Sequence, residues 1–526
     1  MDGAIEDSLA SAVTASGGRG AAVAGAGRLV VVSNRVAKLR RGAQAGGLAV
    51  ALVDALSERG ALWFGWSGEI SKSGAPRHDV EGKLETLGIP LSQEEYDGYY
   101  LGYGNNVLWP LFHYRLDLVR YSDAAFAAYK GVNHRLARAL VKHLRPDDRI
   151  WVHDYHLIPL AWELRRLGCT LPIGFFLHIP FPPADIFAAT PDAAWLTEAL
   201  LHYDVIGLQT QGYLENLLGY FRRLGTATLS PGKIAMDGKS VAVDAFPIGI
   251  DVAAFEALAE SKAKDVAEDH ARRRQLGRKQ IVGVDRLDYS KGLPNRLRAF
   301  GLLLERTTEL HQKVNFLQIA PPTREGLTAY AEIRAEVESL AGSINGRFSD
   351  ISWQPVRFIV RAVSRRKLAA LFRASEVGLV TPLRDGMNLV AKEYIAAQDP
   401  EDPGVLVLSQ FAGAAEELGE ALIVNPLDTE AVALALMQAL QMGRTERRRR
   451  HAALYERIQR QDCHAWLRGF LERLDRVTRA EVMMHTSEGV LPGLAQTHGA
   501  LDEPDHGVGL GKVAPKLAGG GIDILR

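Results

Sequence analysis

Residues 384–393 read Arg384-Asp385-Gly386-Met387-Asn388-Leu389-Val390-Ala391-Lys392-Glu393, and they follow the short apolar run 377–380. Such a run is typical of a buried strand. Gly386 gives the backbone freedom where the strand ends, and helical spacing resumes at Leu389. A helix that begins there offers free backbone N–H groups, which bind anions or hydroxyl groups. With carboxylates at Asp385 and Glu393, this stretch predicts a site for a ligand rich in hydroxyls and phosphate, such as a sugar nucleotide.

Short apolar runs alternate with helical spacing along most of the chain. Strand followed by helix, repeated, implies a parallel sheet that is covered on both faces. We therefore predict an α/β protein with two Rossmann-like, doubly wound domains facing a central cleft, with ligands beyond the carboxyl ends of the strands. The strand candidates are 29–32, 150–152, 173–177 and 205–208 in the first series, and 281–285, 314–319, 377–380, 405–408 and 422–424 in the second.

A chain of 526 residues is too long for one ordinary core, which also favours two domains. We place the N-terminal domain at 28–250. The C-terminal domain with its terminal helices is placed at 251–473; the family resemblance described below implies that the first binds the acceptor and the second the nucleotide sugar. Residues 1–27 are rich in Ala, Gly and Ser and are predicted to be a disordered leader, and 486–526 a disordered tail. Within the second domain, the polar segment 256–274 predicts one helix.

The composition excludes several classes of protein. Lys and Arg number 62 and Asp and Glu also 62, so the net charge is zero, and a nucleic-acid binder that relies on a bulk positive field is disfavoured. Cys169 and Cys463 lack the spacing of a metal site or a disulfide framework, which favours a reducing, cytoplasmic location. No apolar run is long enough to cross a bilayer, and the first residues lack the order of a signal peptide. We expect no membrane partner.

Two basic residues follow the strand candidate 281–285. Arg286 and Lys291 flank a loop at a predicted helix start, where two cations could neutralise a diphosphate without a metal ion. A solvated basic loop is the equal alternative. The chain contains no Asp-x-Asp pair, HExxH zinc signature or P-loop. We therefore expect no metal and no cofactor.

Further polar residues lie at the ends of other strand candidates. Asp154 and His178 follow two strands of the first half and are expected to face the same cleft, although a lone histidine is more often structural. Arg35 and Arg324 also end strands, where arginine can bind a phosphate through two hydrogen bonds; surface cations are the alternative. Tyr100 and Trp109 belong to the aromatic segment 96–114, for which a packed core is the simpler interpretation.

Taken together, the ordered motifs resemble those of the trehalose-6-phosphate synthase family, retaining glycosyltransferases of family 20 with the two-domain GT-B fold. The resemblance covers about residues 28–473, and it is the ordered set that is specific. The matching motifs are 30–35 (VVVSNR), 45–48 (AGGL), 63–68 (WFGWSG), 109–114 (WPLFHY), 153–157 (HDYHL), 176–180 (FLHIP), 286–292 (RLDYSKG) and 385–393.

The resemblance implies transfer of glucose from a nucleotide-glucose, with UDP-glucose expected, to glucose 6-phosphate, giving α,α-trehalose 6-phosphate in trehalose biosynthesis and osmoprotection. Relatives suggest a homo-oligomer, a dimer or tetramer. The implied acceptor-binding residues are Arg35, Tyr100, Trp109, Asp154 and Arg324. The implied donor-binding residues are Gly46, Gly47, His178, Arg286, Lys291, Val363 and the backbone and side chains of Asp385, Gly386, Met387, Asn388, Leu389, Val390, Ala391, Lys392 and Glu393. The implied catalytic set is Asp154, His178, Arg286, Lys291 and Asp385.

The resemblance also implies front-face transfer, in which the leaving diphosphate deprotonates the acceptor and no covalent glycosyl-enzyme forms. Three other functions stay open. A glucosylglycerol-phosphate synthase would keep the fold and use glycerol 3-phosphate. A regulatory homologue would bind sugar phosphates without turnover. A dinucleotide-dependent oxidoreductase is disfavoured, because no G-x-G-x-x-G follows the first strand.

Overall fold

The computed structural model describes residues 27–36, 60–72, 74–261, 264–324 and 327–487. The expected leader at 1–27 lies outside these residues, except for Gly27. Gly46 and Gly47 also lie outside them, and so does the expected tail beyond Ser487. The domain boundaries stay predictions. In the described part, the elements alternate between strand and helix, as the sequence predicts.

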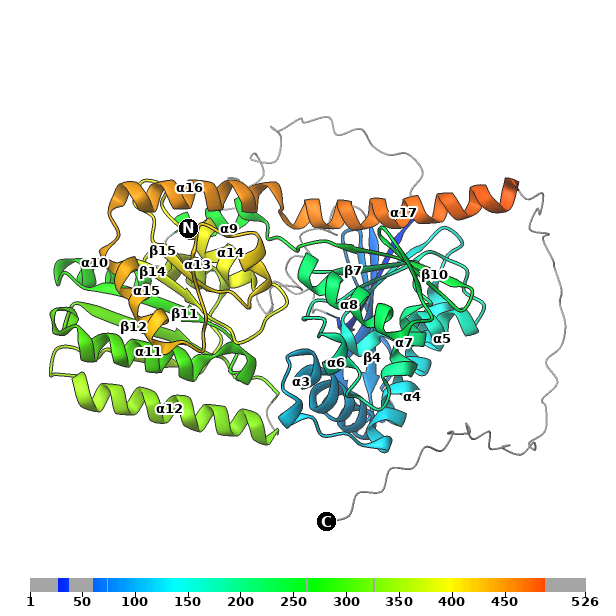
Figure 1. The fold of residues 1–526 in the computed structure, drawn as a ribbon, viewed down its shortest axis with the longest axis horizontal. Coiled ribbons are helices and arrows are strands. Elements are labelled where there is room, and N and C mark those ends of the chain that lie inside the picture. The colour runs from blue at the N-terminus through cyan, green and yellow to red at the C-terminus, as the bar shows by residue number, and fades with distance from the viewer. Residues whose placement is uncertain (1–26, 37–59, 73, 262–263, 325–326, 488–526) are drawn as a thin grey trace, which may run out of the picture. The chain divides into compact units, whose positions relative to one another are not determined.

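The first sheet has ten strands in the order β3-β4-β2-β1-β5-β6-β7-β10-β9-β8 (Figure 1). Its centre is parallel, while β3 pairs with β4 and β9 pairs with β8 and β10 in antiparallel fashion. All strands predicted for this half are confirmed. The strands are β1 (Leu29–Arg35), β2 (Ala61–Ile70), β3 (Arg77–Glu81), β4 (Leu84–Leu91), β5 (Arg149–His153), β6 (Ile173–Phe176), β7 (Val205–Leu208), β8 (Thr228–Ser230), β9 (Lys233–Met236) and β10 (Lys239–Ala245).

The second sheet has six parallel strands in the order β13-β12-β11-β14-β15-β16. Both neighbours of β11 come from later in the chain, so the strand order reverses beside it, and ligands bind at such points in doubly wound sheets. The predicted strands are again confirmed, and β13 was missed. The strands are β11 (Lys279–Val284), β12 (Val314–Ile319), β13 (Val356–Ile359), β14 (Val377–Val380), β15 (Val405–Ser409) and β16 (Leu422–Val424).

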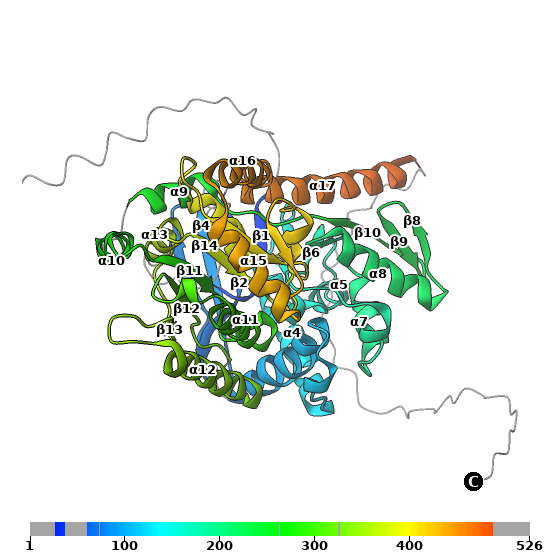
Figure 2. The same ribbon diagram turned by 60° about the vertical axis from the view of Figure 1, so that its left-hand side comes forward.

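Helices cover both faces of each sheet, because alternate residues of the buried strands point to opposite sides. In the first sheet, one face packs on the π-helix Tyr96–Leu108 and on α4 (Asp123–Leu140), α5 (Leu160–Arg166), α7 (Ala193–Leu200) and α8 (Gln211–Leu224) (Figures 1 and 2). In the second sheet, α11 (Leu293–Arg306), α12 (Thr328–Phe348) and α15 (Thr429–Gln441) share one core. The opposite face packs on α9 (Val252–Glu260), α13 (Arg365–Arg373), α14 (Leu389–Ala397) and α16 (Arg444–Arg460).

One apolar cluster contains side chains from both sheets. It includes Trp151 and Phe176 of the first sheet as well as Val282 and Leu406 of the second. The helix α17 (Cys463–Ser487) contributes Phe470, whose ring stacks on Trp151 with 4.6 Å between centroids. This helix therefore packs on the first sheet, and the two halves share a continuous core.

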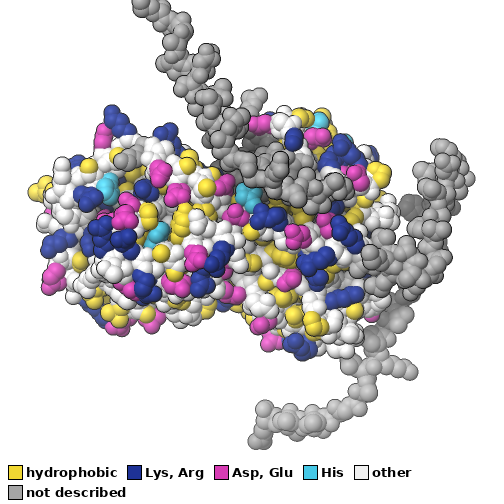
Figure 3. Space-filling model, turned by 90° about the horizontal axis from the view of Figure 1, so that it is seen from above, with side chains coloured by type: hydrophobic (Ala, Val, Ile, Leu, Met, Phe, Trp, Pro, Cys, Tyr) yellow, Lys and Arg dark blue, Asp and Glu magenta, His cyan; other side chains and the backbone are white. Residues whose placement is uncertain are grey.

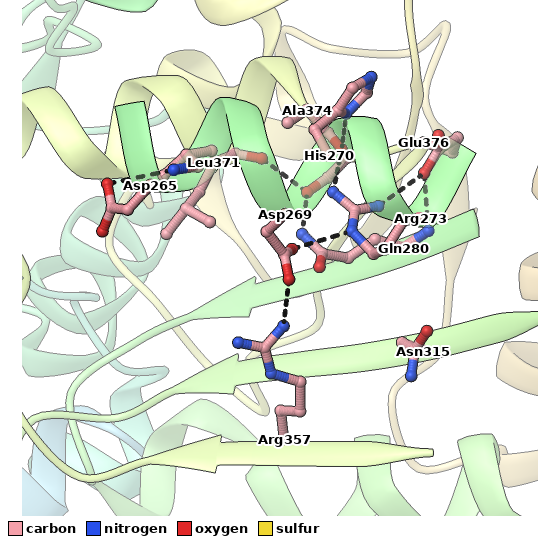
Figure 4. Close-up of polar contacts among 12 residues, drawn as sticks. Asp265, Asp269, His270, Arg273, Gln280, Asn315, Arg357, Leu371, Ala374 and Glu376 are labelled. Carbon is pink, nitrogen blue, oxygen red and sulfur yellow. Dashed lines mark hydrogen bonds and ion pairs between the residues drawn. The ribbon is translucent and has the colours of Figure 1, made fainter. Parts of the chain in front are cut away.

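The prediction of one helix at 256–274 is wrong: α9 ends at Glu260, and α10 (Lys264–Gln275) is a separate helix. Figure 4 shows how α10 is attached to the rest of the second half. Asp269 accepts hydrogen bonds from Arg273 of its own helix (3.1 Å) and from Arg357 of β13 (3.2 Å). The bond from Arg357 is a tertiary contact between α10 and β13, which helical spacing alone does not reveal.

On the face of the molecule that Figure 3 shows, Lys and Arg side chains alternate with Asp and Glu over the described surface. This mixed surface agrees with the zero net charge. None of the described helices combines the length and the apolar character needed to span a membrane.

Candidate active site

Most of the predicted side chains lie at the carboxyl ends of parallel strands, where the sheet topology brings them together. Asp154 and His178 directly follow β5 and β6 of the first sheet. In the second sheet, Arg286 and Lys291 follow β11, Arg324 follows β12, and Asp385 follows β14. Hydrogen bonds, ring contacts and buried charges connect these groups across the two halves.

The Asp385 carboxylate is the centre of the loop between β14 and α14. Its Oδ2 accepts a hydrogen bond from Lys291 Nζ at 2.6 Å and one from Asn388 Nδ2 at 3.0 Å. Burial disfavours the charged carboxylate, but Lys291 outweighs this and holds the pKa of Asp385 below its ordinary value. Asp385 is therefore a fixed, ionised acceptor, and the Lys291 ammonium is fixed with it.

Helix α14 begins at Leu389, as the sequence predicts, and its N-terminus is open. Asn388 has the left-handed φ of 79° and makes no side-chain cap. The first backbone N–H groups of the helix are thus free of a cap and carry the positive end of the helix dipole. Met387 and Ala391 are buried in the core, and Leu389 and Val390 pack partly against it. Met387 and Ala391 can therefore face a ligand only with their main chain.

Lys392 lies on the same helix but points away from the open N-terminus. Its ammonium is buried and donates hydrogen bonds to Ile248 O at 2.8 Å and to Glu417 Oε2 at 2.6 Å. The Lys392 side chain thus ties α14 to the segment that leads out of the first half.

Gly386 is required for close packing rather than for a left-handed turn, since its φ lies outside that region. A Cβ atom at this position would lie 1.9 Å from the carbonyl oxygen of His178. On its other side, a Cβ at Gly413 would lie 2.0 Å from the Gly386 oxygen. The loop between β14 and α14 is therefore packed closely against His178, which follows β6.

His178 is held between polar groups of its own half. Its Nε2 lies 2.9 Å from His153 Nδ1, its Nδ1 lies 3.3 Å from Gln209 Nε2, and its backbone N–H donates to Asp154 Oδ1 at 3.2 Å. Burial lowers the pKa of His178 to about 3 and raises the pKa of Asp154 to about 6. At neutral pH His178 is therefore a neutral imidazole and Asp154 is mostly a carboxylate.

Arg324, which follows β12, makes several buried hydrogen bonds. Its guanidinium donates to Asp288 Oδ2 at 2.7 Å, Asn105 Oδ1 at 2.7 Å and Tyr330 Oη at 2.9 Å. It also lies 3.7 Å above the centre of the Trp109 ring. These partners come from both halves, so Arg324 joins the two sides of the site.

Arg35 and Tyr100 lie around a neighbouring aromatic group. The Arg35 guanidinium is 5.6 Å from the Trp66 ring, which contacts the Tyr100 ring at 5.6 Å. Tyr100 stacks on His156 at 5.6 Å and 12°. The structure thus groups Arg35 with Tyr100, and it connects them to Arg324 through further side chains rather than by direct contact.

Arg286 differs from these enclosed residues because it is exposed. Its guanidinium lies 5.5 Å from the Trp109 ring and makes no hydrogen bond or ion pair within the described residues. It does lower the pKa of both Asp154 and Asp385, which places its charge between the two sides. Arg286 is therefore available to an incoming anion.

Glu393 lies in α14, and Val363 lies just before α13. Burial raises the pKa of Glu393 to about 7, with Arg365 opposing the shift. Val363 is half-buried just before Ser364, which caps the N-terminus of α13.

Comparison with known proteins decides the family. The sequence profile of glycosyltransferase family 20 matches residues 27–476. This chain belongs to glycosyltransferase family 20. It is accordingly a glycosyltransferase with the GT-B fold that its two parallel sheets suggest.

Three relatives illustrate the similarity. The trehalose-6-phosphate synthase of Cronobacter sakazakii is 46% identical over 86% of this chain and 96% of its own. A Burkholderia xenovorans structure, described as a UDP-forming α,α-trehalose-phosphate synthase in complex with glucose-6-phosphate, is 49% identical with a TM-score of 0.83, over 85% of this chain and all (100%) of its own. An Escherichia coli structure, described as bound with UDP-2-fluoro glucose, is 45% identical with a TM-score of 0.82, over 85% and 99%.

Several residues of this family 20 site escaped the sequence-based prediction. Asn105, Tyr155 and Asp288 surround Arg324. His113 is another, since the charges of Asp288 and Lys291 act on its pKa. Asp288 lies between Arg286 and Lys291 in the sequence, and Tyr155 follows Asp154. Their positions next to predicted site residues could have identified them. Asn105 gave none, because an asparagine in an aromatic segment has many uses.

Proposed function

We propose that this family 20 enzyme transfers glucose from UDP-glucose to glucose 6-phosphate, releasing UDP and α,α-trehalose 6-phosphate. One observation carries the proposal. Two groups lie at the carboxyl edge of the second sheet: a buried Lys291–Asp385 pair beside an open helix N-terminus, and a buried Arg324 that packs on Trp109 of the first half, which Arg286 also approaches. The first group suits a sugar diphosphate and the second a sugar phosphate.

On the donor side, the α14 N–H groups and Lys291 bind the diphosphate together with Arg286. Asp385 orients the hydroxyls of the glucose, and Glu393 binds the ribose hydroxyls. Val363, together with Gly46 and Gly47 from outside the described residues, completes this side. The relative that carries UDP-2-fluoro glucose supports a uridine nucleotide as the donor.

On the acceptor side, Arg35 and Arg324 bind the phosphate of glucose 6-phosphate, and Tyr100 and Trp109 pack beside the sugar. The Arg324 guanidinium is already held by Asp288, Asn105 and Tyr330, so it meets the phosphate without having to be ordered. Asp154, which is mostly ionised at neutral pH, accepts a hydrogen bond from a sugar hydroxyl near the reacting carbon.

The reaction retains the configuration and occurs on one face of the donor sugar. The acceptor hydroxyl attacks as the diphosphate leaves, and the leaving oxygen takes its proton. Arg286 and Lys291 stabilise the charge that grows on the diphosphate, which lowers the barrier more than it tightens substrate binding. We place His178 beside the transferred glucose, and because its ring is neutral it donates no proton from an imidazolium.

We also propose that transfer needs no metal ion, that the enzyme is a homo-oligomer, dimer or tetramer, and that it acts in the cytoplasm. Among the described residues, no group of three or more His, Cys, Asp or Glu side chains is arranged to hold a metal ion. Lys291 and Arg286 supply the positive charge that a metal would otherwise bring.

The direct test is an assay of nucleoside diphosphate release. The protein is incubated with EDTA and glucose 6-phosphate, and with UDP-, GDP- or ADP-glucose in turn. We expect release with UDP-glucose, dependent on the acceptor. Parallel reactions contain glycerol 3-phosphate instead. Release with glycerol 3-phosphate but not with glucose 6-phosphate would reassign the enzyme as a glucosylglycerol-phosphate synthase. No release with any pair of donor and acceptor would favour a non-catalytic homologue. A strict need for a divalent cation would overturn the role of Lys291 and Arg286.

A further inference from the structure

A chain of four polar groups lies behind the His178 ring. Ile248 N–H donates to Gln209 Oε1 at 3.1 Å, Gln209 Nε2 lies 3.3 Å from His178 Nδ1, and His178 Nε2 lies 2.9 Å from His153 Nδ1. Gln209 directly follows β7, and Ile248 belongs to the segment after β10. Because every link involves a group with a defined hydrogen-bonding role, the proton positions can be worked out.

The Gln209 amide has only one possible orientation. A backbone N–H group can only donate, so the atom of Gln209 that faces Ile248 must be the oxygen. The NH₂ group then faces His178, and it can only donate. His178 Nδ1 must therefore be the unprotonated, accepting nitrogen of the ring.

The remaining protons follow. A neutral His178 with a bare Nδ1 carries its proton on Nε2, which donates to His153 Nδ1. His153 must in turn carry its proton on Nε2, an atom that is buried without a hydrogen-bond partner among the described residues. A second proton on His178 would face the NH₂ group of Gln209, so the imidazolium is excluded by repulsion as well as by burial.

The other groups around the ring do not alter this assignment. Asp154 binds the backbone N–H of His178 rather than its ring. Asp385 precedes Gly386, whose backbone packs on the His178 carbonyl. The Trp466 ring of α17 closes the remaining side, 6.0 Å from the His178 ring.

We propose that Gln209 is a positioning residue that holds His178 as the neutral Nε2–H tautomer. This rests on the proposed function, in which His178 lies beside the transferred glucose. Positive charge develops at the anomeric carbon during glycosyl transfer, so an imidazolium beside it would raise the barrier. Gln209 thus keeps a cation away from the reacting carbon and fixes the plane of the ring.

The position of Gln209 depends on Ile248, which is held from both sides. Its N–H is bound by Gln209 of the first half, and its carbonyl oxygen accepts from Lys392 of α14 at 2.8 Å. The helix whose N-terminus faces the donor therefore also anchors the residue that orients the Gln209 amide.

Gln209→Glu is the sharpest variant, because it keeps an oxygen for Ile248 N–H and places a second acceptor at His178 Nδ1. Gln209→Met removes the donor without adding charge. The control is Gln280→Glu, which also buries a carboxylate: Gln280 lies at the amino end of β11, away from the site, and donates to Ser375 Oγ at 2.8 Å (Figure 4 shows Gln280). Turnover is measured as a function of pH. Long-range ¹H–¹⁵N spectra of histidine-labelled protein give the tautomer of His178, whose signals are identified as those that are missing from the spectrum of His178→Gln.

We expect the wild-type protein to show neutral, Nε2-protonated His178 at neutral pH. In Gln209→Glu, His178 should be protonated at Nδ1, kcat should fall by at least about tenfold with each KM within about threefold, and a new ionisation should enter the pH profile of kcat. Gln209→Met should give a smaller loss of kcat, and it replaces Gln209→Glu in the test if that variant does not fold.

Three results would overturn the proposal: a wild-type His178 protonated at Nδ1 or on both nitrogens, an unchanged kcat and pH profile in folded Gln209→Glu, or an equal loss of kcat in Gln280→Glu. The spectra need no substrate. An enzyme that fails the substrate assay but shows the Nε2–H tautomer would therefore contradict the proposed function and not the assignment of Gln209.

Discussion

Two carboxylates, Asp385 and Glu393, lie in one ten-residue stretch and have opposite pKa shifts. Asp385 has an ammonium at 2.6 Å, which outweighs the cost of burial. For Glu393, burial dominates, and Arg365 opposes it only in part. The sequence shows two acids with seven residues between them, but their charge states follow from the distance of each to a cation.

Glu393 should make donor binding depend on pH near neutrality. Its pKa of about 7 means that the carboxylate is protonated below that pH and can no longer accept from both ribose hydroxyls. We expect the KM for UDP-glucose to rise about tenfold from pH 8 to pH 6, with the acceptor KM less affected. Initial rates at varied donor concentration measure this, and a Glu393→Gln variant should show a higher KM that no longer changes over this range.

The same ionisation should affect stability. The folded pKa of Glu393 lies above its ordinary value of 4.5, so the unfolded chain loses this proton first as the pH rises. Glu393 therefore lowers the stability of the wild-type protein progressively between those two pH values. Thermal unfolding at pH 5 and pH 8 should show a smaller decrease in Glu393→Gln. Equal decreases in both proteins would place the pKa of Glu393 near its ordinary value.

Lys291→Ala should affect turnover far more than folding. The variant loses the cation that stabilises the leaving diphosphate, and we expect kcat to fall by about 10²–10³-fold. Asp385 is left without its ammonium but keeps the hydrogen bond from Asn388. Steady-state rates and circular dichroism measure the two effects. Lys367→Ala is the control, since Lys367 pairs with Asp265 at an exposed site; near-normal turnover in folded Lys291→Ala would refute its role.

At the scale of elements, the turn from β14 into α14 combines a correct and an incomplete prediction. The helix begins at Leu389 as the spacing indicates. Gly386 was expected to free the backbone, yet the left-handed residue is Asn388, and Gly386 is needed because His178 O lies against it. Backbone approach from another part of the chain is invisible in local sequence.

Gly386→Ala tests this contact. The added Cβ would lie 1.9 Å from His178 O, so the loop or the strand end must move. We expect a loss of about 1–3 kcal/mol in the free energy of unfolding and a clear decrease in kcat/KM. Denaturant unfolding and rate assays measure both. Gly342→Ala in α12 is the matched control: its Cβ meets nothing within 4 Å, so stability should rise by about 0.5–1 kcal/mol without a change in rate.

At the scale of the whole molecule, the two halves are joined by buried contacts as well as by the chain. They share one apolar cluster, and α17 returns to pack Phe470 on Trp151. Polar contacts cross as well, including Arg324 to Asn105 and Lys392 to Ile248. The site therefore depends on the packing between the halves, and a change far from the substrate can alter it.

Lys392→Met should reveal this dependence. The buried ammonium binds both Ile248 O and Glu417, and its loss leaves a largely buried carboxylate unpaired. We expect the free energy of unfolding to fall by about 3–5 kcal/mol. Because Ile248 also orients Gln209, kcat should fall in the protein that remains folded. Lys239→Met, which removes a more exposed pair with Glu198, should change stability by less than about 1 kcal/mol and leave kcat unaltered. Equal effects in the two variants would contradict the role of Lys392.

The sequence by itself determined the alternation of strands and helices, the position of the α14 N-terminus and the motifs of the family, because these depend on local spacing of apolar residues and on residue order. Tertiary structure alone decided that Asp385 is charged while Glu393 holds its proton near neutrality, that Asn105 and Asp288 fix Arg324, and that Gln209 orients His178. Charge states and proton positions depend on burial and on distances between residues far apart in the chain, which only the packing of the two sheets sets.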